Sequence, residues 1–146
     1  MLTLRAAPDT DSAQLAARAQ RSTAHAWSER AYRDSLAAGH AVYLLEQDGI
    51  PVGQAVLMRV GDEAELLDIV IEGDAQGHGL GRTLMEQLLA TLTADGCQRL
   101  LLEVRESNAR ARRLYLGAGL SECGRRRDYY PCADGRETAI LMEAVL

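Results

Sequence analysis

The clearest hydrophobic pattern in the chain is a leucine repeat in its second half. One apolar residue type recurs every four positions, at Leu80, Leu84, Leu88 and Leu92. This spacing places a single apolar stripe on a helix, and Gly96 has the position and type of a helix stop. Largely apolar runs on either side, at residues 64–71 and 100–104, predict two buried strands. A strand, a helix and a strand at these lengths form a right-handed crossover, so the two strands should be parallel.

Weaker patterns supply the remaining elements of a mixed sheet. Further strands are predicted at residues 3–5, 41–47, 51–60, 120–126 and 138–145. Helices are predicted from residue 12 to about 21, from Ser28 to near Gly39, and over residues 108–116, where polar residues can cap the first turns. Asp48-Gly49 is typical of a hairpin turn, and residues 127–137 are expected to form a loop. The predicted fold class is α/β, one domain over residues 1–146, with about seven strands and helices on both faces.

Composition limits the class of protein. The chain has 146 residues, 47% hydrophobic and 25% charged, which suits one soluble globular domain. Since no apolar run approaches the ~20 residues of a membrane span, and residues 1–11 do not resemble a signal peptide, we expect a cytoplasmic protein without a membrane partner. Three cysteines, no CxxC motif and three scattered histidines favour reduced thiols and no metal site.

The charge distribution excludes one kind of partner and suggests another. A net charge of −5 argues against a nucleic-acid partner. All sixteen basic residues are arginine, which we attribute to genomic composition. Acidic residues gather around the strand at 64–71, namely Asp62, Glu63, Glu65, Asp68, Glu72 and Asp74. This cluster is either a solvated acidic edge or a field that attracts a cationic substrate.

The most informative motif lies between that strand and the leucine helix. Residues 76–82 read Gln-Gly-His-Gly-Leu-Gly-Arg. Glycines let the backbone approach a ligand closely, and the free N–H groups of a helix N-terminus favour a phosphate. A plain strand-to-helix turn is the alternative. The spacing does not fit a Rossmann loop, and a Walker A loop needs a lysine, which this chain lacks.

The Q-x-x-G-x-G pattern resembles the acetyl-CoA pyrophosphate loop of the GNAT superfamily of N-acetyltransferases. Residues 101–115, Leu-Leu-Glu-Val-Arg-Glu-Ser-Asn-Ala-Arg-Ala-Arg-Arg-Leu-Tyr, followed by Gly119-Leu120, are similar to a second segment of that family. Residues 126–131, Arg-Arg-Asp-Tyr-Tyr-Pro, and Trp27-Ser28-Glu29 resemble its RimI branch, the bacterial ribosomal-protein alanine N-acetyltransferases. The resemblance runs from about residue 27 to the end, and it implies the GNAT acyl-CoA N-acyltransferase fold.

Two residues could carry the proton transfers of acetyl transfer. Glu103 closes an apolar strand and is either a carboxylate that pairs with Arg105 or a general base. Tyr115 is either a core aromatic or, since its phenol is protonated at neutral pH, a proton donor. The resemblance implies the catalytic roles: Glu103 accepts a proton and Tyr115 gives one to the departing CoA thiolate.

The resemblance also implies the binding residues and the substrate. Acetyl-CoA, as co-substrate and without a metal, would contact Ile69, Val70, Ile71, Gly77, His78, Gly79, Leu80, Gly81, Arg82 and, at its pantetheine, Asn108. A strand bulge within residues 69–71 would offer an N–H to the thioester oxygen. Asp68, Tyr129 and Tyr130 would lie beside the substrate. Two positions depart from the family: Gly77 replaces a frequent arginine, and Asp68 replaces a common asparagine.

The acidity of the protonated amine favours one class of substrate over another. At neutral pH roughly one α-amine in ten is uncharged, against fewer than about one lysine in a thousand, so one carboxylate base suits an α-amine. The resemblance implies the N-terminal alanine of a small-subunit ribosomal protein followed by basic residues, and a monomer or weak homodimer. The alternatives are a GNAT enzyme for other protein N-termini or small amines, and a non-catalytic acetyl-CoA-binding sensor, which retention of Glu103 and Tyr115 disfavours.

Overall fold

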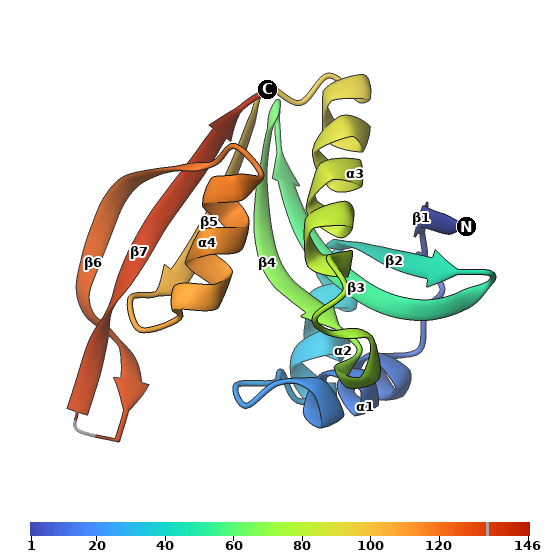
Figure 1. Ribbon diagram of the computed structural model, residues 1–146, viewed down its shortest axis with the longest axis horizontal. Helices are drawn as coiled ribbons and strands as arrows, with labels where there is room; N and C mark the ends of the chain where they lie inside the picture. The colour runs from blue at the N-terminus through green and yellow to red at the C-terminus, as the bar shows by residue number, and fades with distance from the viewer. Residues whose placement is uncertain (134) are drawn as a thin grey trace.

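A seven-stranded mixed sheet, described over residues 1–133 and 135–146 of the computed structural model, runs through the molecule (Figure 1). Its strands are β1 (Leu2–Ala6), β2 (Ala41–Gln47), β3 (Ile50–Val60), β4 (Glu63–Ile71), β5 (Arg99–Arg105), β6 (Ser121–Cys132) and β7 (Gly135–Val145). The strand order is β1-β2-β3-β4-β5-β7-β6, and β4 and β5 form the parallel pair that the crossover predicted. The remaining neighbours pair antiparallel, which confirms the predicted fold class.

Helices cover both faces of the sheet. They are α1 (Ser12–Ser22), α2 (Glu29–Ala37), α3 (Leu80–Ala94) and α4 (Ala109–Gly117), with a short 3-10 helix, η1 (Gly73–Ala75). The leucine stripe of α3 is buried against one face together with Tyr115 of α4. On the other face Leu15 of α1 and Tyr32 of α2 pack on Val70. Alternate residues of the strands therefore supply two cores, as strand geometry requires.

The helix N-termini show where the chain keeps backbone amides free. Asp11, Ser28 and Asn108 cap α1, α2 and α4 by accepting N–H groups with their side chains. Helix α3 instead begins at Gly79, which has a left-handed φ of 76° and no side-chain cap. The first N–H groups of α3 are thus left for another acceptor.

Strands β4 and β5 separate along their length. Their pairing runs from Glu63 with Arg99 to Leu66 with Leu102, and beyond that point the strands diverge, as Figure 1 shows. At the same point β4 bulges, because the register with β3 skips one residue at Leu67. The bulge expected within residues 69–71 therefore lies two residues earlier, since those three residues pair regularly with β3. The extra residue turns Leu67 and Asp68 both toward the face of α1 and α2.

The predicted loop at residues 127–137 is wrong for most of its length. Strand β6 continues to Cys132 and β7 begins at Gly135, so the hairpin extends well past the expected strand ends. Polar residues hid this, because the outer part of β6 faces solvent on both sides. A second irregularity lies between Arg126 and Tyr130, where Asp128 has a φ of 53°. Residue 134 lies outside the described residues.

Candidate functional site

Two cavities adjoin where β4 and β5 diverge. The first, of about 500 Å³, lies between the glycine loop, the end of β4 and α4. The second, of about 390 Å³, lies between β4, β5 and Tyr130 of β6. The residues that line both are Thr23, Ile69, Asn108, Ala111 and Tyr115. A ligand extended through the first cavity would therefore end beside the second at Tyr115.

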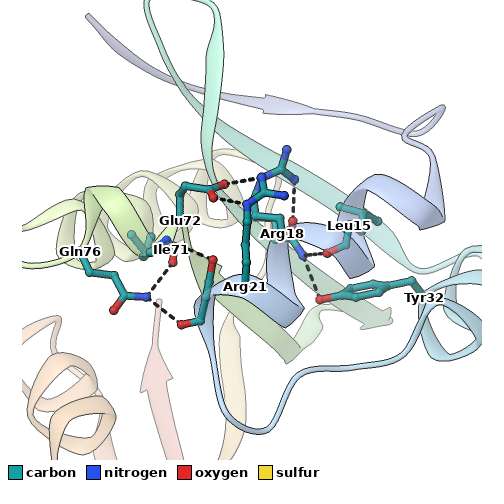
Figure 2. A network of polar contacts seen from close by, with 10 residues as sticks. Leu15, Arg18, Arg21, Tyr32, Ile71, Glu72 and Gln76 are labelled. Carbon is teal, nitrogen blue, oxygen red and sulfur yellow. Dashed lines mark hydrogen bonds and ion pairs between the residues drawn. The ribbon is translucent and has the colours of Figure 1, made fainter.

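The glycine loop is held at its first residue by side-chain hydrogen bonds. Gln76 Nε2 donates to the carbonyls of Ile71 and Ser22, each at 3.0 Å, so one amide joins the end of β4 to the end of α1 (Figure 2). Gly77 and Gly79 both have a positive φ, which a residue with a Cβ rarely adopts. A Cβ on Gly81 would lie 3.4 Å from Leu114, so this glycine lets α3 pack closely on α4. The loop is thus a fixed concave turn of backbone.

The free edge of β4 offers a second set of backbone groups. Glu72 N donates to Val52 O at 2.8 Å, so N–H groups at alternate positions point toward β3. The N–H groups of Ile69 and Ile71 therefore point the other way, to the side where β5 has diverged. Both residues line the first cavity. An extended ligand could hydrogen-bond to this edge as an added strand does.

Nearly all of the predicted acetyl-CoA contacts line this first cavity. They are Ile69, Val70, Ile71, Gly77, Gly79, Leu80, Gly81, Arg82 and Asn108. His78 is exposed and is not among the lining residues. Arg82 pairs with Glu86 at 2.9 Å, and Asn108 Oδ1 caps α4 at Ala111 N. The backbone of the loop and the strand edge could therefore hold an anionic, extended co-substrate such as acetyl-CoA.

Sequence reasoning missed several residues of the first cavity, among them Arg110 and Thr23. Arg110 lies in the first turn of α4 and adds a cation to the lining. Thr23 follows α1 and lies between the two cavities. A signal for Arg110 was present, because it follows the capping Asn108 by two residues. No signal in the sequence pointed to Thr23, whose position depends on how α1 packs against β4.

Glu103 and Tyr115 both line the second cavity. The Glu103 side chain is 18% exposed, and its Oε1 lies 3.4 Å from Arg126 Nε. Tyr115 is 5% exposed, and burial, followed by the charge of Asp68, raises the pKa of its phenol well above the ordinary range. The phenol therefore stays protonated at neutral pH, as a proton donor must.

The two tyrosines of β6 occupy different places. Tyr130 lines the second cavity, and the Arg105 guanidinium lies 4.5 Å from its ring centre. Burial raises the pKa of Tyr130, and the charge of Glu103 adds to the effect. Tyr129 is 43% exposed, packs edge-on against Tyr130 and is not among the lining residues.

Asp68 is the remaining carboxylate of the second cavity. Burial raises its pKa to about 6, although a hydrogen bond from the Tyr32 hydroxyl partly opposes this. Behind Tyr32 lies a buried chain of polar groups: Gln54 Nε2 donates to Tyr32 Oη at 2.9 Å, and Arg18 donates to Gln54 Oε1 at 2.7 Å. Figure 2 shows Arg18 and Tyr32 at the two ends of the part of this chain that it draws. Tyr32, Gln54 and Arg18 come from three separate segments, and no pattern in the sequence indicates that they meet.

The acidic cluster predicted around β4 is not a single field. Arg18 and Arg21 both pair with Glu72, and the hydrogen bond from Arg21 lowers the pKa of that carboxyl. Glu63 lies 3.6 Å from Arg99. Among the six acidic residues, Asp68 alone lines either of these two cavities, within the described residues. Of this acidic cluster, a substrate in the second cavity would therefore meet the charge of Asp68 and not a field from all six residues.

Two kinds of feature are absent from residues 1–133 and 135–146. No helix there is long and apolar enough to cross a membrane. No three histidine, cysteine or acidic side chains in these ranges are grouped to hold a metal ion.

Comparisons with known proteins agree on one family. The model of the acetyltransferase (GNAT) family matches residues 10–119. The chain is 42% identical over 123 residues to the [ribosomal protein bS18]-alanine N-acetyltransferase of Escherichia coli K12, covering 84% of this chain and 83% of that one. The crystal structure of the ribosomal-protein-S18-alanine N-acetyltransferase from Escherichia coli superposes with a TM-score of 0.90 at 39% identity, over 99% of this chain and 94% of that chain. A Bacillus subtilis acetyltransferase in complex with CoA shares the fold, with a TM-score of 0.82 at 13% identity over 100% and 99% of the chains.

Proposed function

This chain belongs to the GNAT acetyltransferase family, and we propose that it transfers the acetyl group of acetyl-CoA to the N-terminal alanine of ribosomal protein bS18. The observation that carries this proposal is the meeting of two cavities at Tyr115 and Ile69. One cavity offers free backbone amides for an extended anion, and the other offers carboxylates and a buried phenol. A relative that is 42% identical to this chain is named for acetylation of the bS18 alanine.

Each part of the site has a role in this reaction. The N–H groups of the glycine loop and of α3 hold the pyrophosphate, and the edge of β4 at Ile69 and Ile71 holds the pantetheine and polarises the thioester carbonyl. Glu103 accepts a proton from the attacking nitrogen, and Tyr115 protonates the departing thiolate. Tyr130 and Asp68 line the place where the peptide N-terminus enters, with Tyr129 at its outer edge.

The substrate class follows from the same surfaces. A peptide that begins with alanine presents a small side chain and a cationic N-terminus to the second cavity, where Asp68 and Glu103 attract the charge. The exposed rim, with Tyr129, leaves room for the residues that follow. We expect the protein to act as a monomer or weak homodimer, with no nucleic acid or membrane taking part.

The test is release of free CoA from acetyl-CoA in the presence of two peptides. One begins with a free alanine followed by basic residues, and the other has a blocked N-terminus and an internal lysine. We expect turnover with the first peptide alone. Turnover with the second would move the assignment to lysine side chains. Acetyl-CoA binding without turnover of either peptide would favour another amine or a non-catalytic sensor.

Variants test the assigned roles. Glu103→Gln and Tyr115→Phe should each lower kcat by about 100-fold or more, the usual contribution of a positioned acid or base, while acetyl-CoA still binds. Glu106→Gln is the matched control, since Glu106 is exposed, pairs with Arg125 and lines neither cavity. Unchanged turnover in Glu103→Gln or Tyr115→Phe would contradict the roles.

A further inference from the structure

The reaction proposed above moves more protons than Glu103 and Tyr115 can handle alone. An N-terminal ammonium carries three protons, and the amide nitrogen of the product keeps one. Two protons must therefore leave the nitrogen as the C–N bond forms and the C–S bond breaks. One proton ends on the CoA sulfur, and the other is released to water. If Glu103 takes the proton that leaves after attack, the proton that must leave before attack still needs an acceptor.

Asp68 lies where such an acceptor would have to be. It lines the second cavity together with Glu103 and Tyr115. Burial raises the pKa of the Tyr115 phenol, and the negative charge of Asp68 adds to this effect. The bulge at Leu67 turns Asp68 toward α2, so that one carboxylate oxygen, Oδ2, accepts the hydroxyl of Tyr32.

The polar chain behind Asp68 has a fixed direction. A guanidinium only donates, so Arg18 requires that the Gln54 oxygen faces it. The Gln54 amide nitrogen must then face Leu15 O, at 3.1 Å, and Tyr32 Oη. Because Tyr32 Oη accepts from Gln54, its own proton goes to Asp68. The last group of the chain, the Tyr32 hydroxyl, thus donates to Oδ2 of Asp68, and this hydrogen bond favours the ionised carboxylate.

Burial in this chain is nearly complete. Gln54 and Tyr32 are fully buried, and Arg18 is 7% exposed. Burying polar groups costs free energy unless they are hydrogen-bonded. A buried hydrogen-bonded chain that ends at a carboxylate of the cavity therefore has a use beyond stability.

We propose that Asp68 is a second proton acceptor of the site, which takes the first proton from the substrate ammonium and is positioned by Arg18, Gln54 and Tyr32. The inference rests on the proposed function. The ammonium donates to Asp68, and the neutral nitrogen then attacks the thioester carbon. Glu103 takes the second proton from nitrogen, and Tyr115 gives its proton to sulfur as the C–S bond breaks. The Glu103 proton returns to Tyr115, and the Asp68 proton leaves to water.

Several titratable or charged groups hydrogen-bond to Asp68 or line the second cavity with it, and they bear on any pH profile. They are Tyr32 on α2, Tyr115 on α4, Glu103 and Arg105 on β5, Tyr130 on β6, and His25 in the segment before α2. Each is retained in the variants below except the one replaced, so the profiles can be compared directly.

The decisive experiment compares the pH dependence of kcat/KM in the wild type and Asp68→Asn, with the alanine peptide. In the wild type Asp68 takes the extra proton of a bound ammonium, and an amine that is already neutral needs no such step, so kcat/KM should rise through about pH 6 and then stay level. Asp68→Asn needs an amine that is already neutral, so its kcat/KM should keep rising to about pH 8, the ordinary pKa of an α-amine. We expect a loss of about 100-fold at pH 7 that shrinks to about ten-fold at pH 9. An equal loss at both pH values, or no loss, would overturn the proposal.

Tyr32→Phe tests the positioning chain separately. Removing the hydroxyl takes away the donor that keeps Asp68 ionised, so the acidic limb of the profile should move to higher pH. A purely structural role would lower activity without moving this limb. Asp62→Asn is the matched control for Asp68→Asn, because it makes the same charge change at the exposed β3–β4 turn and should leave the profile unchanged.

A titration without substrate keeps the two proposals apart. Carbon NMR of the Asp68 carboxyl should show a midpoint near 6 in the wild type and a higher one in Tyr32→Phe. If neither peptide is turned over, the proposed function fails, and the titration still reports on Asp68. A midpoint near the ordinary aspartate value of about 4 would overturn the inference itself.

Discussion

The two sides of the second cavity are built in opposite ways. One side, the helical wall, consists of the partly buried Asp68 and, behind it, the buried Tyr32, Gln54 and Arg18, all joined by hydrogen bonds in one direction. The other side, the hairpin wall, consists of Glu103, Arg105, Arg126 and Tyr130, which meet through ion pairs and Arg–Tyr contacts near solvent. Buried bonds fix one geometry, whereas exposed pairs are weak and can rearrange.

The difference assigns separate tasks to the two walls. A proton acceptor must lie at one place and have one charge, so the buried helical wall suits the chemistry. A peptide of variable sequence is better met by side chains that can move, so the hairpin wall suits recognition. Destabilising the helical wall should therefore cost folding free energy, and changing the hairpin wall should mainly change substrate binding.

The largest expected effect is on the helical wall, from Arg18→Ala. The change leaves the Gln54 oxygen buried without its donor and removes a buried partner of Glu72. We expect a loss of about 3 kcal/mol in the free energy of unfolding, measured by urea denaturation. Arg21→Ala is the matched control, because Arg21 pairs with the same carboxylate but its side chain is 55% exposed, and it should cost less than about 1 kcal/mol. Equal losses would show that the buried hydrogen bond from Arg18 to Gln54 adds no more stability than an exposed ion pair.

Asp68→Asn should have the opposite sign. The pKa of Asp68 is about 6 in the fold against 3.8 ordinarily, so the folded protein binds this proton more tightly than the unfolded chain. Stability from Asp68 is therefore present at low pH and is lost as pH rises from about 4 to 6. Removing the charge should stabilise the protein by up to about 3 kcal/mol at pH 7 and by little at pH 4. Thermal unfolding at both pH values checks this, and a uniform change would contradict it.

Most of the fold could be predicted from the sequence because the patterns that mark its elements are local. The leucine repeat, the glycine stops and the capping residues Asp11, Ser28 and Asn108 each act within a few residues. The outer half of the β6–β7 hairpin was missed because neither face is buried, so no alternation of apolar residues marks it. The bulge was misplaced because its position depends on pairing with β3, which the sequence of β4 does not encode.

The site was predictable in the same uneven way. The glycine loop, Glu103 and Tyr115 stand in short segments with family resemblance, and all of these residues except His78 line one of the two cavities. Tyr32 and Gln54 look like ordinary helix and strand residues. Their hydrogen bonds join positions 22 apart in the chain, a contact that only tertiary packing creates.

On the β6 side of the cavity, replacing each of two adjacent tyrosines distinguishes peptide recognition from surface packing. Tyr130→Ala removes a ring that lines the cavity, so we expect the KM for the alanine peptide to rise about ten-fold, or about 1.4 kcal/mol, with kcat little changed. Tyr129→Ala, the matched neighbour, should change KM by less than about two-fold because that ring is 43% exposed. Steady-state kinetics measures both. Equal effects would place the peptide over the outer face of the hairpin.

The smallest expected effect comes from Arg126→Ala, which breaks the 3.4 Å ion pair with Glu103. The Arg126 side chain is 55% exposed, so the free energy of unfolding should change by less than about 1 kcal/mol. Its charge repels a basic peptide and partly cancels Glu103, so the variant should raise kcat/KM for that peptide a few-fold at low salt. In about 1 M salt, where the screening length is about 3 Å, most of this gain should vanish. A salt-independent loss of activity would instead mean that Arg126 holds Glu103 in its working position, and that the hairpin wall shares the chemistry of the helical wall.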